Sequence, residues 1–458
     1  MLRVLRVLRV LWFIGVVAVL IVAAVWLAEN PGNVTIGATI PGRDWPHVEI
    51  TTSVGVLLAF ATAVAILLSF VYGIWRWLRT GPRRLVSGRA ARRREQGFLA
   101  LTRGLVAVAA GDAKAAQRFG RRSGRLLDNP LSLLVLAQSA QLNGDEAAAR
   151  RHFRAMLDHS ETEFLGLRGL LVQATKAGDW DAALGYARRA YALRPSAEWV
   201  SSALFDLEVR AGDWRAAQKT LEAAVRHKHV GPADAPRRRA VVLIQRARVA
   251  RAAGRDEEAL RLAREAHKLS PDLVAATVLA AELLTAAGKA RAAAAIIEEG
   301  WTIAPHPRLA GAYAAIAPEE TAMQRAKRIE RLHARAPDHL ESQIAAAEAA
   351  LAADLWGTAR GHLEAAARGR PTQRVFRLMA TLEERDGGDA EAIRSWLLRA
   401  AGAPPDAAWR CDQCGMAADE WGTRCESCGA FDSLAWRPPR VLSFGDGRAI
   451  GHGRADCG

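Results

Sequence analysis

The 458-residue sequence contains little cysteine and few aromatic residues. Its five cysteines are too few for a framework of disulfide bonds, which excludes the small secreted scaffolds that depend on one. Aromatic residues make up 6% of the chain, whereas half of all residues are hydrophobic and alanine is prominent. This composition excludes a disordered or collagen-like chain and favours helices.

The sequence also lacks the motifs of several enzyme classes. It has no Gly-x-Gly-x-x-Gly motif after an expected strand, no phosphate-binding loop and no nucleophile constellation. It has no Cys-x-x-Cys-His motif for haem attachment, and we expect most histidines of the chain to be surface residues rather than ligands. We therefore expect a protein that is not an enzyme. An enzyme of haem synthesis is the alternative, which an assay of porphyrinogen turnover would test.

Acidic residues are too few to balance the bases. The chain has 63 Lys and Arg against 48 Asp and Glu, a net charge of +15. Residues 1–94 hold 12 Arg and three acids (net +9), and the other 364 hold 51 bases and 45 acids (net +6). Such an excess favours a polyanionic partner, either nucleic acid or an anionic membrane surface. Because most of it flanks two uncharged stretches, we expect the membrane, with nucleic acid as a minor alternative.

The two uncharged stretches are residues 10–28 and 50–75. As a helix, the shorter one of 19 residues would span about 28 Å, close to the hydrocarbon thickness of a bilayer. We predict a transmembrane helical hairpin with spans at about 10–28 and 50–75. A cleaved signal peptide is the alternative for the first span, but Trp26-Leu27-Ala28 makes a poor cleavage site.

Basic residues set the expected orientation of this hairpin. The exit segment 76–94 holds eight Arg and no acid, whereas the connecting loop 29–49 holds only Arg43 against three acids. Basic residues stay on the cytoplasmic side, so both termini and the rest of the chain are expected in the cytoplasm. We also expect the basic exit 76–94 to contact anionic lipid.

A glycine-centred pattern recurs after the anchor at residues 1–94. Gly-Asp or a near variant begins at Gly111, Gly144, Gly178, Gly212, Gly254 and Gly288, with spacings of 33, 34, 34, 42 and 34. A period of 34 is typical of helix–turn–helix tetratricopeptide (TPR) repeats. We predict an all-α solenoid of nine helix pairs over 95–404. The seventh and eighth pairs are degenerate, and Ala353-Asp354 and Gly388-Asp389 are expected as the later turns. The unit of 42 residues carries an eight-residue insertion around 229–239, which we expect to be a longer loop.

The pattern has a physical reason in packing. Each Gly allows the tight turn, and the Asp after it can cap the second helix. A small residue stands five positions after each turn Gly: Ala116, Ala149, Ala183, Ala217, Ala259 and Ala293. Prolines are expected to end second helices at Pro195, Pro271, Pro305, Pro337 and Pro371. An ordinary bundle would not keep this register, and the concave face of a solenoid, lined by first helices, is expected to bind protein partners.

Four cysteines near the C-terminus have the spacing of a metal site. Cys411, Cys414, Cys425 and Cys428 form two Cys-x-x-Cys knuckles, each followed by Gly. Four thiolates can close tetrahedrally on one metal ion, so we predict a structural Zn or Fe in a small ribbon at 405–440. A pair of disulfides is the alternative. We expect five apolar side chains to form the ribbon core: Trp409, Trp421, Phe431, Leu434 and Trp436. Cys457 lies in a tail at 441–458 that we expect to be flexible, and we expect this cysteine to be unpaired.

The N-terminal half resembles the HemY N-terminal domain family. The resemblance is carried by the hairpin, by Trp26 followed by Val34-Thr35-Ile36, by the basic exit and by residues 97–105 leading into Gly111-Asp112. It implies a bacterial inner-membrane protein with two spans and TPR repeats, linked to haem or tetrapyrrole biosynthesis. The chain does not resemble the flavin-dependent protoporphyrinogen oxidase that shares the HemY name.

The C-terminal part is similar to lipopolysaccharide-assembly protein B, which joins a membrane anchor, TPR repeats and a rubredoxin-like four-Cys module. The four cysteines of the ribbon are the matching positions. The anchor and the solenoid favour an inner-membrane scaffold or adaptor that binds partner proteins, and the HemY resemblance alone implies its link to haem biosynthesis. The alternatives are an adaptor that regulates lipopolysaccharide assembly through a partner protease, and a porphyrin-binding carrier.

Overall fold

The computed structural model describes residues 32–37, 49–127, 129–369 and 371–439, with seven further residues between Gly15 and Trp26. Most of the first predicted span and the tail with Cys457 lie outside the described residues. The chain divides into two compact units, Met1–Asp145 and Glu146–Gly458. Each unit is described by itself.

The first unit begins with a pair of antiparallel strands. Strand β1 (Asn33–Gly37) pairs with β2 (Glu49–Ser53), and Ile36 lies opposite Ile50. The expectation that the second span is helical from residue 50 is therefore wrong for residues 50–53. These residues are mostly β-branched, which suits them to pairing in a strand.

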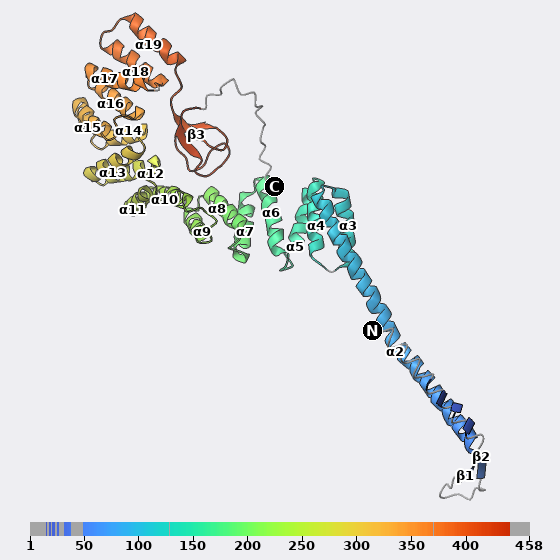
Figure 1. Cartoon of the computed structure of the whole chain (residues 1–458). Coiled ribbons are helices and arrows are strands. Elements are labelled where there is room, and N and C mark those ends of the chain that lie inside the picture. The colour runs from blue at the N-terminus through green and yellow to red at the C-terminus, as the bar shows by residue number, and fades with distance from the viewer. Residues whose placement is uncertain are drawn as a thin grey trace. The chain divides into compact units, whose positions relative to one another are not determined.

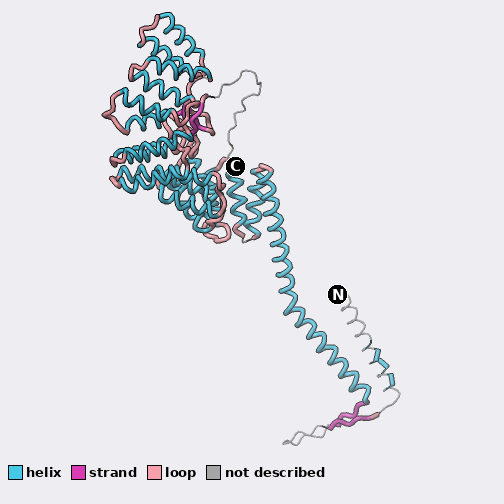
Figure 2. Tube along the Cα trace, turned by 60° about the vertical axis from the view of Figure 1, so that its left-hand side comes forward, coloured by secondary structure: helices cyan, strands magenta, loops and turns pink. Residues whose placement is uncertain are grey.

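Helix α2 (Val54–Ala109) has 56 residues and is about 84 Å long. It runs through the second predicted span and the basic exit into the first repeat, where it contacts α3 (Ala113–Leu126) and α4 (Leu131–Leu142) (Figure 2). The domain boundary predicted after residue 94 falls inside this helix. Among the residues that the structure describes, no helix is both long and apolar enough to span a membrane.

The second unit is a stack of helices followed by a small sheet (Figure 1). The first helices of its pairs are α6 (Glu163–Ala177), α8 (Glu198–Ala211), α10 (Asp234–Ala252), α12 (Val274–Ala286), α14 (Pro307–Ala315), α16 (Leu340–Ala352) and α18 (Gln373–Arg385). Helix α5 (Glu146–Met156) precedes these pairs, and their second helices are α7 (Trp180–Leu193), α9 (Trp214–Arg226), α11 (Asp256–Leu269), α13 (Ala290–Ile303), α15 (Ala322–His333), α17 (Trp356–Arg368) and α19 (Ala390–Gly402).

The predicted repeat geometry is confirmed within each unit: α2 packs against α3 in the first unit, and seven successive helix pairs, from α6 and α7 to α18 and α19, follow one another in the second. All six turn glycines from Gly111 to Gly288 have a left-handed φ between 70° and 75°. Asp112, Asp179 and Asp213 each accept a hydrogen bond from a backbone N–H in the first turn of the second helix. The six alanines expected at the helix contacts are completely buried.

The later repeats keep the register with other residues. Asp354 has a left-handed φ of 55° and lies 66 residues, two repeats, after Gly288. The next left-handed turn residue is Gly387, 33 residues further on, so the expectation that Gly388 makes this turn is wrong by one residue. Between Gly288 and Asp354, a capping box formed by Thr321 and Gln324 marks the start of α15.

The eight-residue insertion in the fifth pair is only partly a loop. Helix α10 begins at Asp234 and has 19 residues, so the expected loop around 229–239 is wrong from residue 234 onward. The longer helix extends the first-helix side of the solenoid at this pair.

The C-terminal ribbon is a three-stranded antiparallel sheet in the order β4-β3-β5. Its strands are β3 (Ala408–Cys411), β4 (Ala417–Ala418) and β5 (Leu434–Arg437). Both neighbours pair with β3, which places Trp409 opposite Trp436 and Cys411 opposite Leu434. The ribbon lies beside α10 and α12, well before the end of the helix stack (Figure 1).

Candidate metal centre and its seat on the solenoid

Two tight turns hold the four predicted cysteines. Gly415 has a φ of +75° and donates its backbone N–H to the carbonyl of Cys411 over 2.9 Å. Gly429 has a φ of +74° and donates in the same way to Cys425 over 2.8 Å. A residue with a Cβ is strained at such φ values, which explains why Gly follows each knuckle.

The four sulfur atoms lie within 4.8 Å of one another. The Sγ atoms of Cys411 and Cys428 are 3.6 Å apart, as are those of Cys414 and Cys425. Ideal tetrahedral coordination with metal–sulfur bonds of about 2.3 Å would separate the sulfurs by about 3.8 Å. A disulfide would bring a pair to about 2.05 Å, so the sulfurs have the spacing of metal ligands and the alternative of two disulfides does not match.

The environment of the site favours a cation. Burial raises the pKa of the Cys411 thiol, but its hydrogen bond with the Ser433 hydroxyl and those with backbone N–H groups of the knuckle outweigh burial and bring the pKa to about 6. At Cys428 the backbone N–H of Ala430 lowers the pKa, while burial and the three neighbouring thiols raise it, to about 12 in balance. Four thiolates therefore repel one another when no cation is bound, and a divalent metal ion would remove that repulsion.

The ribbon is attached to the solenoid by a two-point ion pair. Arg237 of α10 donates from Nε to Oδ2 of Asp432 over 2.7 Å and from Nη2 to Oδ1 over 3.1 Å. Burial raises the pKa of the Asp432 carboxyl, and the Arg237 guanidinium opposes that shift. A planar guanidinium fork on a carboxylate fixes distance and angle together, so this contact sets the orientation of the ribbon.

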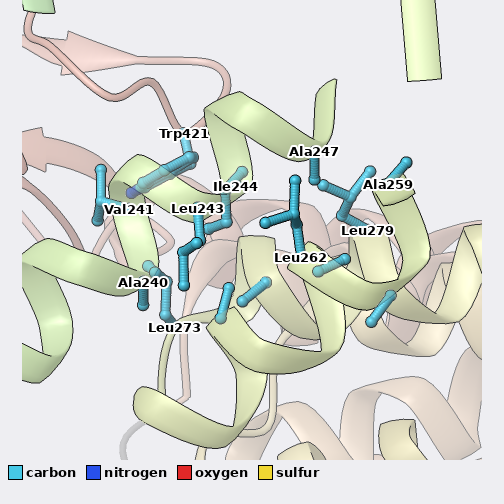
Figure 3. Close-up of a cluster of buried hydrophobic side chains, with 14 of the residues drawn as sticks. Ala240, Val241, Leu243, Ile244, Ala247, Ala259, Leu262, Leu273, Leu279 and Trp421 are labelled. Atoms are coloured by element: carbon cyan, nitrogen blue, oxygen red, sulfur yellow. The ribbon is translucent and has the colours of Figure 1, made fainter. Parts of the chain in front are cut away.

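Aromatic side chains make the rest of the contact. Phe431 packs edge-on against Phe205 of α8 with the ring centroids 5.0 Å apart. The His306 ring, at the start of α14, lies 4.3 Å from that of Trp436 and 5.2 Å from that of Trp409. Trp421 lies over α10 beside Val241 and Ile244 (Figure 3). The expected ribbon core is therefore shared with the first helices of the solenoid.

Sequence reasoning missed Arg237, His306 and Phe205, because their partners lie more than 100 residues away. We expected most histidines at the surface, and His267 and His306 are the buried exceptions among the described residues, with 5% and 2% exposed. His306 caps α14, since its Nδ1 accepts from the backbone N–H of Arg308 over 3.0 Å. Its position directly before Pro307 was the available signal, because a proline often opens a helix.

Two hollows lie on the first-helix side next to the ribbon. The larger, of about 610 Å³, lies between α10, α12 and the start of α14, with Val278 and Ala312 among its apolar residues. The smaller, of about 180 Å³, is lined on the ribbon side by Trp409 and Trp421. Arg251, Glu282 and Arg308 line both hollows, so the two adjoin.

The fold and the site define a protein of stacked helix pairs that carries a four-cysteine ribbon. Residues 44–144 match the model of the HemY protein N-terminus, and residues 174–233 match a tetratricopeptide repeat model. The resemblance to HemY is thus confirmed for a region that includes residues 97–112. The similarity to lipopolysaccharide-assembly protein B stays a prediction.

One curated relative and two solved structures are similar to this chain. The probable magnetosome protein Mms48 of Magnetospirillum gryphiswaldense is 29% identical over 416 residues, which is 90% of each chain. "Structure of Naa15/Naa10 bound to HypK-THB" has a TM-score of 0.39 at 13% identity, over 67% of this chain and 53% of that one. A tetratricopeptide repeat protein from Parabacteroides merdae has a TM-score of 0.28 at 15% identity, over 52% of this chain and 98% of that one.

Proposed function

We propose that this protein is a membrane-anchored scaffold, without catalytic activity, that binds partner proteins on the first-helix side of its solenoid. The observation that carries the proposal is the pair of adjoining hollows between α10, α12, α14 and the ribbon. They combine apolar walls with charged side chains, as protein-binding surfaces of stacked repeats do. The partner would touch both the solenoid and the ribbon.

The proposed anchor is supported by apolar surface on α2. Phe60 and Phe70 are 71% and 67% exposed, and Ile66, Leu67 and Leu68 each exceed 60%. No charged residue occurs between 50 and 75, and eight Arg follow within 76–94. An apolar surface of this extent favours burial in lipid or protein, and the arginines favour a cytoplasmic exit at a bacterial inner membrane that carries anionic lipid.

In this proposal the ribbon binds one Zn or Fe as a structural ion. Protein thiolates would fill all four ligand positions, which leaves no open position for a substrate or a reactive water. The ion would hold the two knuckles together and so keep Trp409 and Trp421 in place as the wall of the smaller hollow. Ion binding and partner binding are therefore coupled in the proposal.

The HemY resemblance implies partners from haem biosynthesis, and these are the first to test. The Mms48 relative, by its name, supports a magnetosome context instead. A lipopolysaccharide-assembly protease and a porphyrin ligand are the remaining alternatives. The identity of a crosslinked protein separates the first three, and an absorption shift on titration with haem tests the last.

The test is crosslinking in intact membranes from two matched positions. Gly311 of α14 lines the larger hollow, and Gly361 of α17 lies on a second helix; at both, an added Cβ would meet nothing within 4 Å. Benzoylphenylalanine is placed at each. The proposal expects a defined protein band from position 311 that is absent from position 361. Equal yields at both positions, or no crosslinked protein, would contradict it.

A further inference from the structure

Helix α3 has a continuous cationic stripe along one face. Its 14 residues include no acid and five bases: Lys114, Arg118, Arg121, Arg122 and Arg125. At 100° per residue these five lie within about 100° of the helix circumference, and all five are exposed. The opposite face is buried through Ala116, Gly120 and Ser123, so the helix is fixed in its rotation.

The stripe has no neutralising partner among the described residues. None of its five bases forms an ion pair with a described carboxylate, and the nearby Asp112 is occupied in capping the helix. Arg118 instead lies over the ring of Phe119, 5.1 Å from its centroid. Like charges three or four positions apart destabilise a helix by about 0.2–0.5 kcal/mol per pair. An anionic ligand would reverse this repulsion.

The stripe also borders a hollow. A space of about 490 Å³ is lined by the five bases together with Gln96 of α2, Gln117 and Leu126. The two amides add hydrogen-bonding groups, and no aromatic residue lines the space. Without such a ring, bases of single-stranded nucleic acid have no surface to stack on, which disfavours that ligand.

We propose that the α3 stripe binds an acidic segment of a protein partner, at a second site separate from the first-helix hollows. Four of the five bases are arginines, whose planar forks bind carboxylates at two points. From Lys114 to Arg125 the stripe is about 16 Å long, which matches about five residues of extended peptide.

Distance along α2 disfavours a lipid headgroup as the ligand. Gln96 follows Trp75, the last residue of the uncharged stretch, by 21 residues, or about 32 Å of continuous helix. Charges in physiological salt are screened beyond about 8 Å. The arginines of 76–94 are nearer to the apolar surface and suit headgroups better than α3 does.

The experiment uses the full chain in phosphatidylcholine nanodiscs and a fluorescein-labelled deca-glutamate peptide that carries a photo-crosslinker. One variant combines Arg118→Gln, Arg121→Gln and Arg125→Gln. The matched control combines Arg215→Gln, Lys219→Gln and Arg226→Gln, which removes three exposed bases from α9, another second helix. Circular dichroism confirms that both variants keep their helix content.

We expect peptide affinity to fall about tenfold or more in the α3 variant, by less than about twofold in the control, and to weaken with salt. We also expect crosslinks to map to α3. Equal weakening in both variants, or crosslinks elsewhere, would overturn the proposal. Loss of peptide binding in phosphatidylglycerol nanodiscs would also overturn the proposal, because it would assign the stripe to lipid. Tighter α3-dependent binding of a single-stranded oligonucleotide than of the peptide would overturn it as well.

Discussion

Arg237 and Asp432 form a two-point ion pair although 195 residues separate them in the sequence. The Asp432 side chain is only 9% exposed, whereas that of Arg237 is 37% exposed. Arg237 also contacts Asp272 over 3.0 Å. One guanidinium therefore links the ribbon, α10 and the start of α12, and the position of the ribbon on the solenoid depends on it.

Replacing Arg237 with Ala should loosen the ribbon. The change leaves the Asp432 carboxylate nearly buried and unpaired, and we expect a loss of about 2 kcal/mol, between the values typical of exposed and buried pairs. Hydrogen exchange of the β3 and β5 amides should accelerate about thirtyfold. Arg261→Ala, at an exposed pair with Glu265, is the control and should leave that exchange unchanged. Unchanged exchange in Arg237→Ala would show that the pair does not hold the ribbon.

His306 should make the stability of the ribbon contact depend on pH. Burial, with Arg308 nearby, lowers the pKa of His306 from 6.5 to about 4. The folded state thus prefers the neutral ring, and stability is lost as pH falls from about 6.5 to about 4, by about 3 kcal/mol in all. His306→Asn keeps a capping side chain but does not titrate, so its ribbon amides should show a flatter pH dependence of hydrogen exchange. Parallel pH curves for the two proteins would contradict this prediction.

The metal site predicts a defined stoichiometry. Elemental analysis of the purified chain should give about one Zn or Fe per chain, because four thiolates complete one tetrahedral shell. The double variant Cys411→Ser and Cys414→Ser should lose it, while Cys457→Ser should retain it. Equal metal content in the double variant and the wild type would place the ion elsewhere.

Two glycines of one repeat should respond in opposite directions to alanine. Gly178 has a φ of +72°, where a Cβ is strained, so Gly178→Ala should destabilise its helix pair by about 1 kcal/mol. Gly185 lies within α7, and an added Cβ there meets nothing within 4 Å, so Gly185→Ala should stabilise by about 0.5–1 kcal/mol. Thermal unfolding followed by circular dichroism compares them. The same sign for both would refute the assigned turn.

Much of the fold could be predicted from the sequence because its repeats depend on local rules. A left-handed turn needs Gly, a helix start needs a cap, and a close helix contact needs Ala, so Gly178, Asp179 and Ala183 mark one repeat directly. Other residues can solve the same problem. Asp354 adopts the left-handed turn expected at Ala353-Asp354, whereas the capping box by which Thr321 begins α15 was not predicted.

The cysteine site was also predictable, because the two cysteines of each knuckle are three positions apart in the sequence. Its position on the solenoid was not. That position depends on Arg237 meeting Asp432 and on Phe205 meeting Phe431, contacts that no spacing rule encodes. Strand β2 was missed for a related reason. Residues 50–53 continue the uncharged stretch in the sequence, but their pairing with β1 makes them a strand.

The measurement that tests the central claim most directly is the ratio of partner crosslinking at position 311 to that at position 361. It is carried out in membranes on two proteins, one with the ribbon intact and one with Cys411→Ser and Cys414→Ser. The account predicts a high ratio that falls towards one when the metal ligands are removed, because the ribbon forms part of the binding surface. A ratio near one with the ribbon intact, or a high ratio that the cysteine substitutions leave unchanged, would contradict it.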